Sequence, residues 1–194
     1  RMKVSFALLE QNEIVHRLDK DLNQMDLIIG QLLESARLQQ SNKALHIETY
    51  FLPSFISEAI EEQESCGRLL VDDEVPDIAI DIDVGRIKFL LRNLINNALT
   101  HSGDEQKVSI SFNKNDSHVL ISVKDHGSGI KETYLKDIFE PFTSTSPINN
   151  RKTNGLGLGL FLSKRIAIAH GGELAVFSQE GKGSIVTLHL PYYA

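Results

Sequence analysis

The sequence has little of three features that would each indicate a class of protein. Cys66 is the only cysteine among 194 residues, which excludes an internal disulfide and gives no sign of an exported disulfide scaffold. No apolar run approaches the ~18 residues that span a bilayer, and the first residues do not resemble a signal peptide. The formal net charge of −6 disfavours general nucleic-acid binding, which requires a basic surface. Because the chain begins at Arg1 rather than at methionine, we expect it to be part of a longer protein.

Residues 1–40 have the periodicity of a helical hairpin. Apolar side chains recur every three or four residues along one helical stripe, formed by Ile14, Leu18, Leu22, Met25, Ile29, Leu32 and Ala36. A shorter apolar arm over residues 2–10 precedes a plausible bend at 11–13. Two arms cannot cover so long a stripe, which favours a second hairpin and a four-helix bundle. The alternative is that the stripe packs against the rest of the chain.

Residues 41–194 form the second predicted domain. A polar linker covers 39–44, and from His46 the sequence has a mixed α and β pattern. The pattern predicts strands near 47–51, 69–71, 78–80, 107–113, 118–124, 173–178 and 184–190. It predicts helices near 53–64, 84–100, 131–137 and 158–170. Asp83 is a suitable N-cap for the second of these helices, and Gly171 stands where the last one ends.

The long helix predicted at 84–100 carries two asparagines on one face. Asn93 and Asn97 are four residues apart, and asparagine is a mediocre helix former. An amide oxygen is a suitable ligand for Mg²⁺, a hard cation that shares phosphate oxygens. The alternative is that both are solvated surface amides, and the pair alone favours that alternative.

A second cluster, Asp125-His126-Gly127-Ser128-Gly129, directly follows a predicted strand. A carboxylate at a strand end, followed by glycines that permit a tight turn, is suited to accept a hydrogen bond from a ligand amine. The pattern by itself is weak, because many surface turns share it.

A third cluster, Ile138-Phe139-Glu140-Pro141-Phe142, places two aromatic rings either over a flat ligand or in the core. It is followed by a polar stretch from Thr143 to Asn154 that contains Arg151 and Lys152. Loops of this length are uncommon unless they are disordered or act as lids.

A fourth cluster, Gly155-Leu156-Gly157-Leu158-Gly159-Leu160, opens the last predicted helix. Glycines allow a phosphate to approach the backbone, and the free amides of a helix start favour anions. A Walker A loop would require Gly-Lys-Ser/Thr, but Leu160 and Phe161 follow Gly159. A dinucleotide fingerprint starting at Gly157 would require a further glycine where Leu162 stands.

In combination the four clusters are specific. From about His46 to Leu190, their order and spacing closely resemble the catalytic domain of sensor histidine kinases, within the wider family of gyrase, heat-shock-chaperone and mismatch-repair ATPases. The segments that carry the resemblance are RNLINNALTHS (92–102), DHGSG (125–129), IFEPF (138–142), NGLGLGL (154–160) and GKGS (181–184). The resemblance implies a two-layer α/β sandwich, a mixed and mostly antiparallel sheet with three main helices on one face. It also implies that residues 1–40 are part of a dimerisation and phosphotransfer hairpin.

The resemblance further implies a site for ATP and Mg²⁺. Asn97 would ligate the metal, with Asn93 beside it contacting metal or phosphate, and both are the candidate catalytic residues. Asp125 would accept the adenine amino hydrogen. The remaining candidate nucleotide contacts are His101, Gly127, Gly129, Ile130, Phe139, Phe142, Arg151, Lys152, Gly155, Leu156, Gly157, Leu158, Gly159 and Leu160. His101 would touch a phosphate or merely cap its helix. Thr100 departs from the pattern, because many such kinases carry a basic residue there.

The implied activity is transfer of the ATP γ-phosphoryl group to a histidine, for relay to an aspartate of a response regulator receiver domain. A homodimer through the hairpin is implied, with the catalytic domain in the cytoplasm and the full-length protein in the bacterial inner membrane. None of the seven histidines has the acceptor's flanking pattern, so we expect this chain not to phosphorylate itself. The alternatives are an ATP-hydrolysing relative of gyrase or mismatch-repair type, and a nucleotide-binding scaffold without turnover. Asn93 stands where those hydrolases carry a glutamate base, which favours the kinase.

Overall fold

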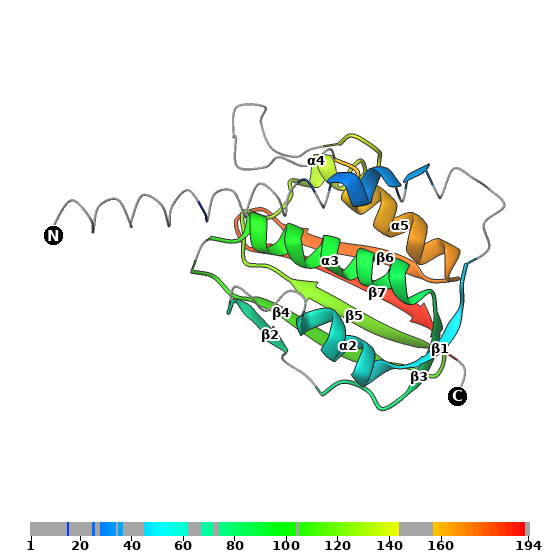
Figure 1. Cartoon of the computed structure of the whole chain (residues 1–194). Helices are drawn as coiled ribbons and strands as arrows, with labels where there is room; N and C mark the ends of the chain where they lie inside the picture. The colour runs from blue at the N-terminus through cyan, green and yellow to red at the C-terminus, as the bar shows by residue number, and fades with distance from the viewer. Residues whose placement is uncertain are drawn as a thin grey trace, which may run out of the picture.

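The computed structural model describes residues 15, 25, 28–33, 35–36, 45–61, 67–71, 74–103, 105–143 and 157–192. Within them, one five-stranded sheet is covered on one face by helices (Figure 1). Its strand order is β2 (Leu69–Val71), β4 (Val108–Lys114), β5 (His118–Lys124), β7 (Gly183–Pro191) and β6 (Glu173–Gln179). Only β2 and β4 pair in parallel; the other neighbours in this sheet are antiparallel. The α/β sandwich expected from the sequence is therefore confirmed.

Two early strands form a separate small sheet rather than joining the large one. β1 (Glu48–Phe51) pairs antiparallel with β3 (Ala79–Ile82), with Tyr50 opposite Ile80. The third strand of the chain thus begins and ends slightly later than the sequence predicts. Its alternation is also clear, because Ile80 and Ile82 are buried while Ala79 and Asp81 are exposed.

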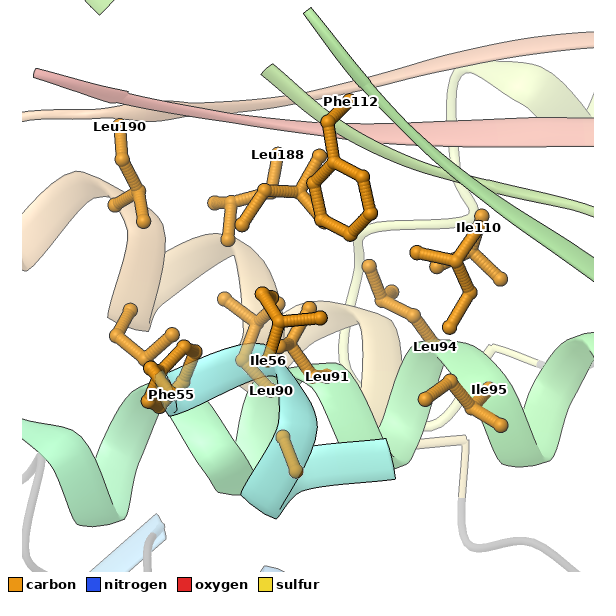
Figure 2. Packing of buried hydrophobic residues seen from close by; sticks show 14 of the residues in the cluster. Phe55, Ile56, Leu90, Leu91, Leu94, Ile95, Ile110, Phe112, Leu188 and Leu190 are labelled. Carbon is orange, nitrogen blue, oxygen red and sulfur yellow. The ribbon is translucent and has the colours of Figure 1, made fainter. Parts of the chain in front are cut away.

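Between residues 45 and 192, three of the described helices pack on the inner face of the sheet, and a fourth is a single turn. They are α2 (Leu52–Glu61), α3 (Val84–His101), α5 (Gly159–Ala169) and the short α4 (Glu132–Leu135). Figure 2 shows the core between layers, where Phe112, Leu188 and Leu190 from the sheet lie opposite Phe55 and Leu90 from the helices. A Leu side chain buried in this way contributes about 1.5–3 kcal/mol relative to an exposed one.

Helix α3 forms where its sequence repeats apolar residues at helical spacing. Its buried apolar residues are Ile87, Leu90, Leu91, Leu94, Ile95 and Ala98. Asp83 is the N-cap, and its Oδ1 accepts the N–H of Arg86 at 3.1 Å. This cap confirms the helix start that the sequence predicts. It also fixes the residue from which the positions of Asn93 and Asn97 along α3 are counted.

The hairpin predicted at 1–40 lies mostly outside the described residues. Residues 28–33 and 35–36 are helical, and Gly30 lies against Phe89 and Arg92 of α3. Of the predicted apolar stripe, Met25, Ile29 and Leu32 are exposed by 57%, 49% and 53%. About half of the surface of each of these three side chains is therefore exposed. The hairpin and the alternative stated for the stripe both stay predictions. The expected linker at 39–44 also lies outside the described residues.

His170 joins the end of α5 to the start of α3. Its Nε2 lies 3.0 Å from the backbone N of Asp83, which donates to it, and its Nδ1 lies 2.8 Å from the carbonyl oxygen of Ile166. Because Nε2 accepts, the proton of the neutral ring is on Nδ1. Burial lowers the pKa of His170, although the Ile166 carbonyl and Asp83 act in the opposite direction and Arg86 acts with burial. Protonation of Nε2 would remove the bond from Asp83.

We predict that acid destabilises the protein through His170. A lowered pKa in the folded state means that the unfolded chain binds the proton more readily, so stability is lost as the pH falls below the ordinary histidine value of about 6.5. The loss from one such proton is at most about 1.4 kcal/mol for each pH unit. Urea unfolding of wild type and His170→Gln at pH 7.5 and 5.5 should show a smaller pH difference in the variant. Equal pH differences would assign the effect to other groups.

Candidate functional site

Three polar residues follow one another along the same side of α3, at positions 93, 97 and 101. Asn93 is 2% exposed, and its Nδ2 has no hydrogen-bond partner within the described part of the chain. Asn97 is half-buried, whereas His101 is exposed at the end of the helix. The more buried of the two amides thus has a donor, Nδ2, with no partner among the described residues.

The start of α5 lies next to Asn93. A Cβ added to Gly159, the first residue of α5, would be 3.8 Å from Oδ1 of Asn93. The N-cap of α5 is Leu158, which is buried and supplies no side-chain hydrogen bond to the first turn. The first N–H groups of a helix have no partner inside it, so they remain available to an acceptor. Leu160 in the same turn packs against the core instead.

Gln31 was not anticipated as part of this site. It is 5% exposed, its Nε2 lies 3.4 Å from the Cβ position of Gly159, and its Oε1 has no partner among the described residues. Its position in the sequence, beside the apolar stripe of the first forty residues, carries no signal for this contact. The helical residues 28–33 therefore reach the start of α5, next to Asn93.

Asp125 directly follows β5, and its carboxylate accepts a hydrogen bond within the loop that it begins. Its backbone N–H donates to the Ser184 carbonyl at 2.9 Å, and its Oδ1 accepts the N–H of Gly127 at 2.8 Å. Oδ1 thus stabilises the turn, and Oδ2 has no hydrogen-bond partner among the described residues. Asp125 as a whole is only 8% exposed.

The loop after Asp125 fits only because it contains glycine at two positions. A Cβ on Gly127 would lie 2.1 Å from the carbonyl oxygen of His101, at the end of α3. A Cβ on Gly129, whose φ is +65°, would lie 2.1 Å from the carbonyl oxygen of Gln179, at the end of β6. The loop is therefore clamped between a helix end and a strand end.

The third cluster of the sequence separates into core and surface. Ile138 is buried, and Phe139 is half-buried under the ammonium of Lys164, whose Nζ lies 4.7 Å from the ring centroid. Phe142 is 73% exposed and has a φ of +63°, so it does not fill the core. Its N–H donates to the carbonyl of Gly157 at 3.0 Å.

This hydrogen bond links Phe142 and Gly157, which lie on either side of the segment that the sequence predicts as a lid. Gly157 has a φ of +67°, and a Cβ there would lie 2.7 Å from the carbonyl oxygen of Thr143. Residues 144–156 lie outside the described residues, and they include the predicted contacts Arg151, Lys152, Gly155 and Leu156. Those four stay predictions, as do the other predicted nucleotide contacts and the lid itself.

A comparison with known families decides what this arrangement belongs to. A sequence model described as "Histidine kinase-, DNA gyrase B-, and HSP90-like ATPase" matches residues 82–194, more than half of the chain. The chain belongs to this family. The match contains every described residue of the predicted site, and it confirms the resemblance found in the sequence.

Curated relatives of this ATPase-family chain are sensor proteins. The alginate biosynthesis sensor protein KinB of Pseudomonas aeruginosa is 30% identical over 98% of this chain and 34% of its own length. The sensor histidine kinase WalK of Bacillus subtilis is 31% identical over 96% of this chain and 30% of its own length. The chain therefore spans about a third of these relatives.

Solved structures of histidine kinases share the fold of the family member described here. Full-length ShkA in complex with AMPPNP superposes with a TM-score of 0.72 over 95% of this chain and 40% of its own, at 24% identity. The catalytic domain of histidine kinase ThkA, in a nucleotide-free form, gives 0.61 over 75% of this chain and 97% of its own, at 28% identity. The described residues contain no helix long and apolar enough to cross a membrane.

We predict that Gly127→Ala destabilises this ATPase-family domain by about 1–3 kcal/mol, the usual cost of forcing atoms into a filled space. The added Cβ would collide with backbone at His101, which cannot move aside as a flexible side chain would. Gly103→Ala is the matched control, because its nearest neighbour is the Gln106 side chain at 3.5 Å and neither glycine has a positive φ. Urea unfolding of both variants checks this, and equal losses would contradict the clash.

Proposed function

We propose that this chain binds Mg²⁺-ATP and transfers the γ-phosphoryl group to a histidine, which passes it to an aspartate of a response regulator receiver domain. The observation that carries the proposal is the buried, unpartnered Nδ2 of Asn93 beside the uncapped start of α5. Residues 41–194 form the catalytic domain in this proposal, and residues 1–40 belong to a hairpin that dimerises with a second copy. The exposed Met25, Ile29 and Leu32 support an apolar partner for that hairpin.

Asp125 suits the base end of the nucleotide. Its Oδ2 has no partner within the described residues, and it accepts the adenine amino hydrogen in this proposal. Gly127 and Gly129 let this loop pack closely against the end of α3 and the end of β6, which holds Asp125 in place. A guanine would present a carbonyl where adenine presents an amine, so two acceptors would face each other.

The phosphate end requires donors for oxygen and ligands for Mg²⁺, and the residues present fit both. Asn93 Nδ2 and the first N–H groups of α5 are donors without side-chain partners in the described chain. The amide oxygens of Asn97 and Asn93 are hard ligands that leave metal positions for water and phosphate. Among the described residues, no three or more His, Cys, Asp or Glu side chains are grouped so that they could hold a metal ion. When bound, Mg²⁺ would neutralise charge that develops on the transferring phosphoryl group.

The acceptor in this proposal is an imidazole rather than water. Hydrolysis requires a base to take a proton from water, and an amide at position 93 cannot do so. A neutral imidazole needs no such base, because its ordinary pKa of about 6.5 leaves it unprotonated and nucleophilic at neutral pH. The acceptor histidine is expected on a hairpin segment that this sequence does not contain. The catalytic domain would then act in the cytoplasm, with the whole protein held in the inner membrane.

We expect ATP to bind far more tightly than GTP. A site built around one hydrogen bond discriminates by up to ~10⁴ against a ligand that lacks the matching group. Asp125→Asn is the informative variant, because Oδ1 can still accept the N–H of Gly127 while the new amide N–H₂ can donate to a guanine carbonyl. Calorimetric titration should show a narrower ATP-to-GTP ratio in this variant. Similar affinities for both nucleotides in the wild type would remove Asp125 from this role.

We expect Asn97→Ala to abolish phosphoryl transfer while the domain stays folded, since the change removes a metal ligand and no buried apolar contact. Asn96→Ala is the control, because Asn96 is also half-buried but points about 100° away around α3. The assay supplies a hairpin with an acceptor histidine, radiolabelled ATP and Mg²⁺, and measures acid-labile, base-stable phosphate. Transfer by Asn97→Ala at the wild-type rate would show that the metal is held elsewhere.

A further inference from the structure

Two serines interrupt the apolar inner face of the β6–β7 hairpin. Side chains two residues apart on a strand share a face, and Leu174 and Val176 of β6 lie opposite Leu188 and Val186 of β7. The next pair in the same register is Ser178 opposite Ser184. Their Oγ atoms are 2.9 Å apart, and Ser184 is 8% exposed. The core thus ends in a hydroxyl pair at the edge that meets the loop after Asp125.

The hydroxyl of Ser178 joins that loop to the turn of the hairpin. The N–H of Ile130 donates to Ser178 Oγ at 2.8 Å, and Ser178 Oγ donates to the Gly183 carbonyl at 3.0 Å. A hydroxyl has one proton and two acceptor sites, so the Ser184 hydroxyl must donate the remaining bond. Every hydrogen-bonding site of Ser178 is then used. Neither serine is free to rotate toward solvent without breaking a bond.

We propose that Ser178 positions the loop of residues 125–130, here called the base-binding loop, and hence the Asp125 carboxylate, for nucleotide recognition. This inference rests on the proposed function. Two further bonds hold the loop, from Asp125 N–H to the Ser184 carbonyl and from Gly181 N–H to the Ser128 carbonyl. Both are backbone bonds that do not depend on a side chain. Ser178 provides the side-chain bond at the far end of the loop, where Ile130 follows the glycines. Without it, the Ile130 end of the loop is released, and the Gly127 N–H that orients Asp125 Oδ1 is held less firmly.

The test compares Ser178→Thr with Ser178→Val, two substitutions of nearly equal shape that differ in retaining or losing the hydroxyl. Leaving the Ile130 N–H without a partner should weaken ATP binding by about tenfold in the Val variant, but much less in the Thr variant. GTP binding should change little, because the guanine carbonyl cannot donate a hydrogen bond to the Asp125 carboxylate. The ATP-to-GTP ratio should therefore fall in the Val variant only.

Ser122→Ala is the matched control for a merely structural role. Its Oγ pairs with Thr187 Oγ1 at 2.9 Å between β5 and β7, so it also breaks an inter-strand hydroxyl pair, but on the outer face of the sheet. It should leave both nucleotide affinities unchanged. Hydrogen exchange in the nucleotide-free protein provides an independent readout, and the Ile130 amide should exchange faster in Ser178→Val than in Ser178→Thr.

Equal ATP affinity and equal Ile130 exchange in the Val and Thr variants would overturn the inference. So would a selectivity ratio that falls as much in Ser122→Ala as in Ser178→Val. A wild type that binds neither nucleotide would instead refute the proposed function, while the exchange of Ile130 would still report whether Ser178 holds the loop.

Discussion

Burial of the apolar stripe of α3 is the constraint on which the site depends. That stripe faces the sheet, and the Asp83 cap and the His170 bridge fix where the helix starts. A helix whose one face is held in this way has no freedom to rotate. Its Asn93 amide therefore lies beside the start of α5, and the carbonyl of His101 lies against the loop at Gly127. Candidate site residues on three elements are thus placed by the packing of one helix.

The second constraint is the close approach of backbones around the loop that follows Asp125. Gly127 meets the His101 carbonyl, Gly129 meets Gln179, and Gly183, with a φ of +96°, lies so close to Asp125 that a Cβ would be 2.2 Å from its carbonyl oxygen. Side chains at these positions would separate the helix end, the loop and the hairpin turn. Glycine is needed here for space between chain segments as much as for turn geometry.

The sequence predicts the elements well because their signals are local. The apolar repeat and Asp83 predict α3, and the alternation in β4 and β5 predicts their hairpin, which the structure forms with Ser111 opposite Ser122. The separation of β1 and β3 into their own sheet could not be predicted, because pairing partners are set by tertiary packing. The site was predicted as four clusters, but not Gln31 or Ser178. Both act through contacts with residues far away in the chain, and neither residue type signals such a contact.

Asn93 shows why a residue that is poor for folding marks function. A buried amide donor without a partner costs about 1–3 kcal/mol, and native proteins keep few of them. An apolar residue at position 93 would extend the stripe of α3 and remove that cost. The cost is therefore not required by the fold, and it falls beside the start of α5, whose N-cap, Leu158, supplies no side-chain acceptor. Donors left unpaired on both α3 and α5 point to the same missing acceptor, and an oxygen-rich anion held between the two helices would satisfy both.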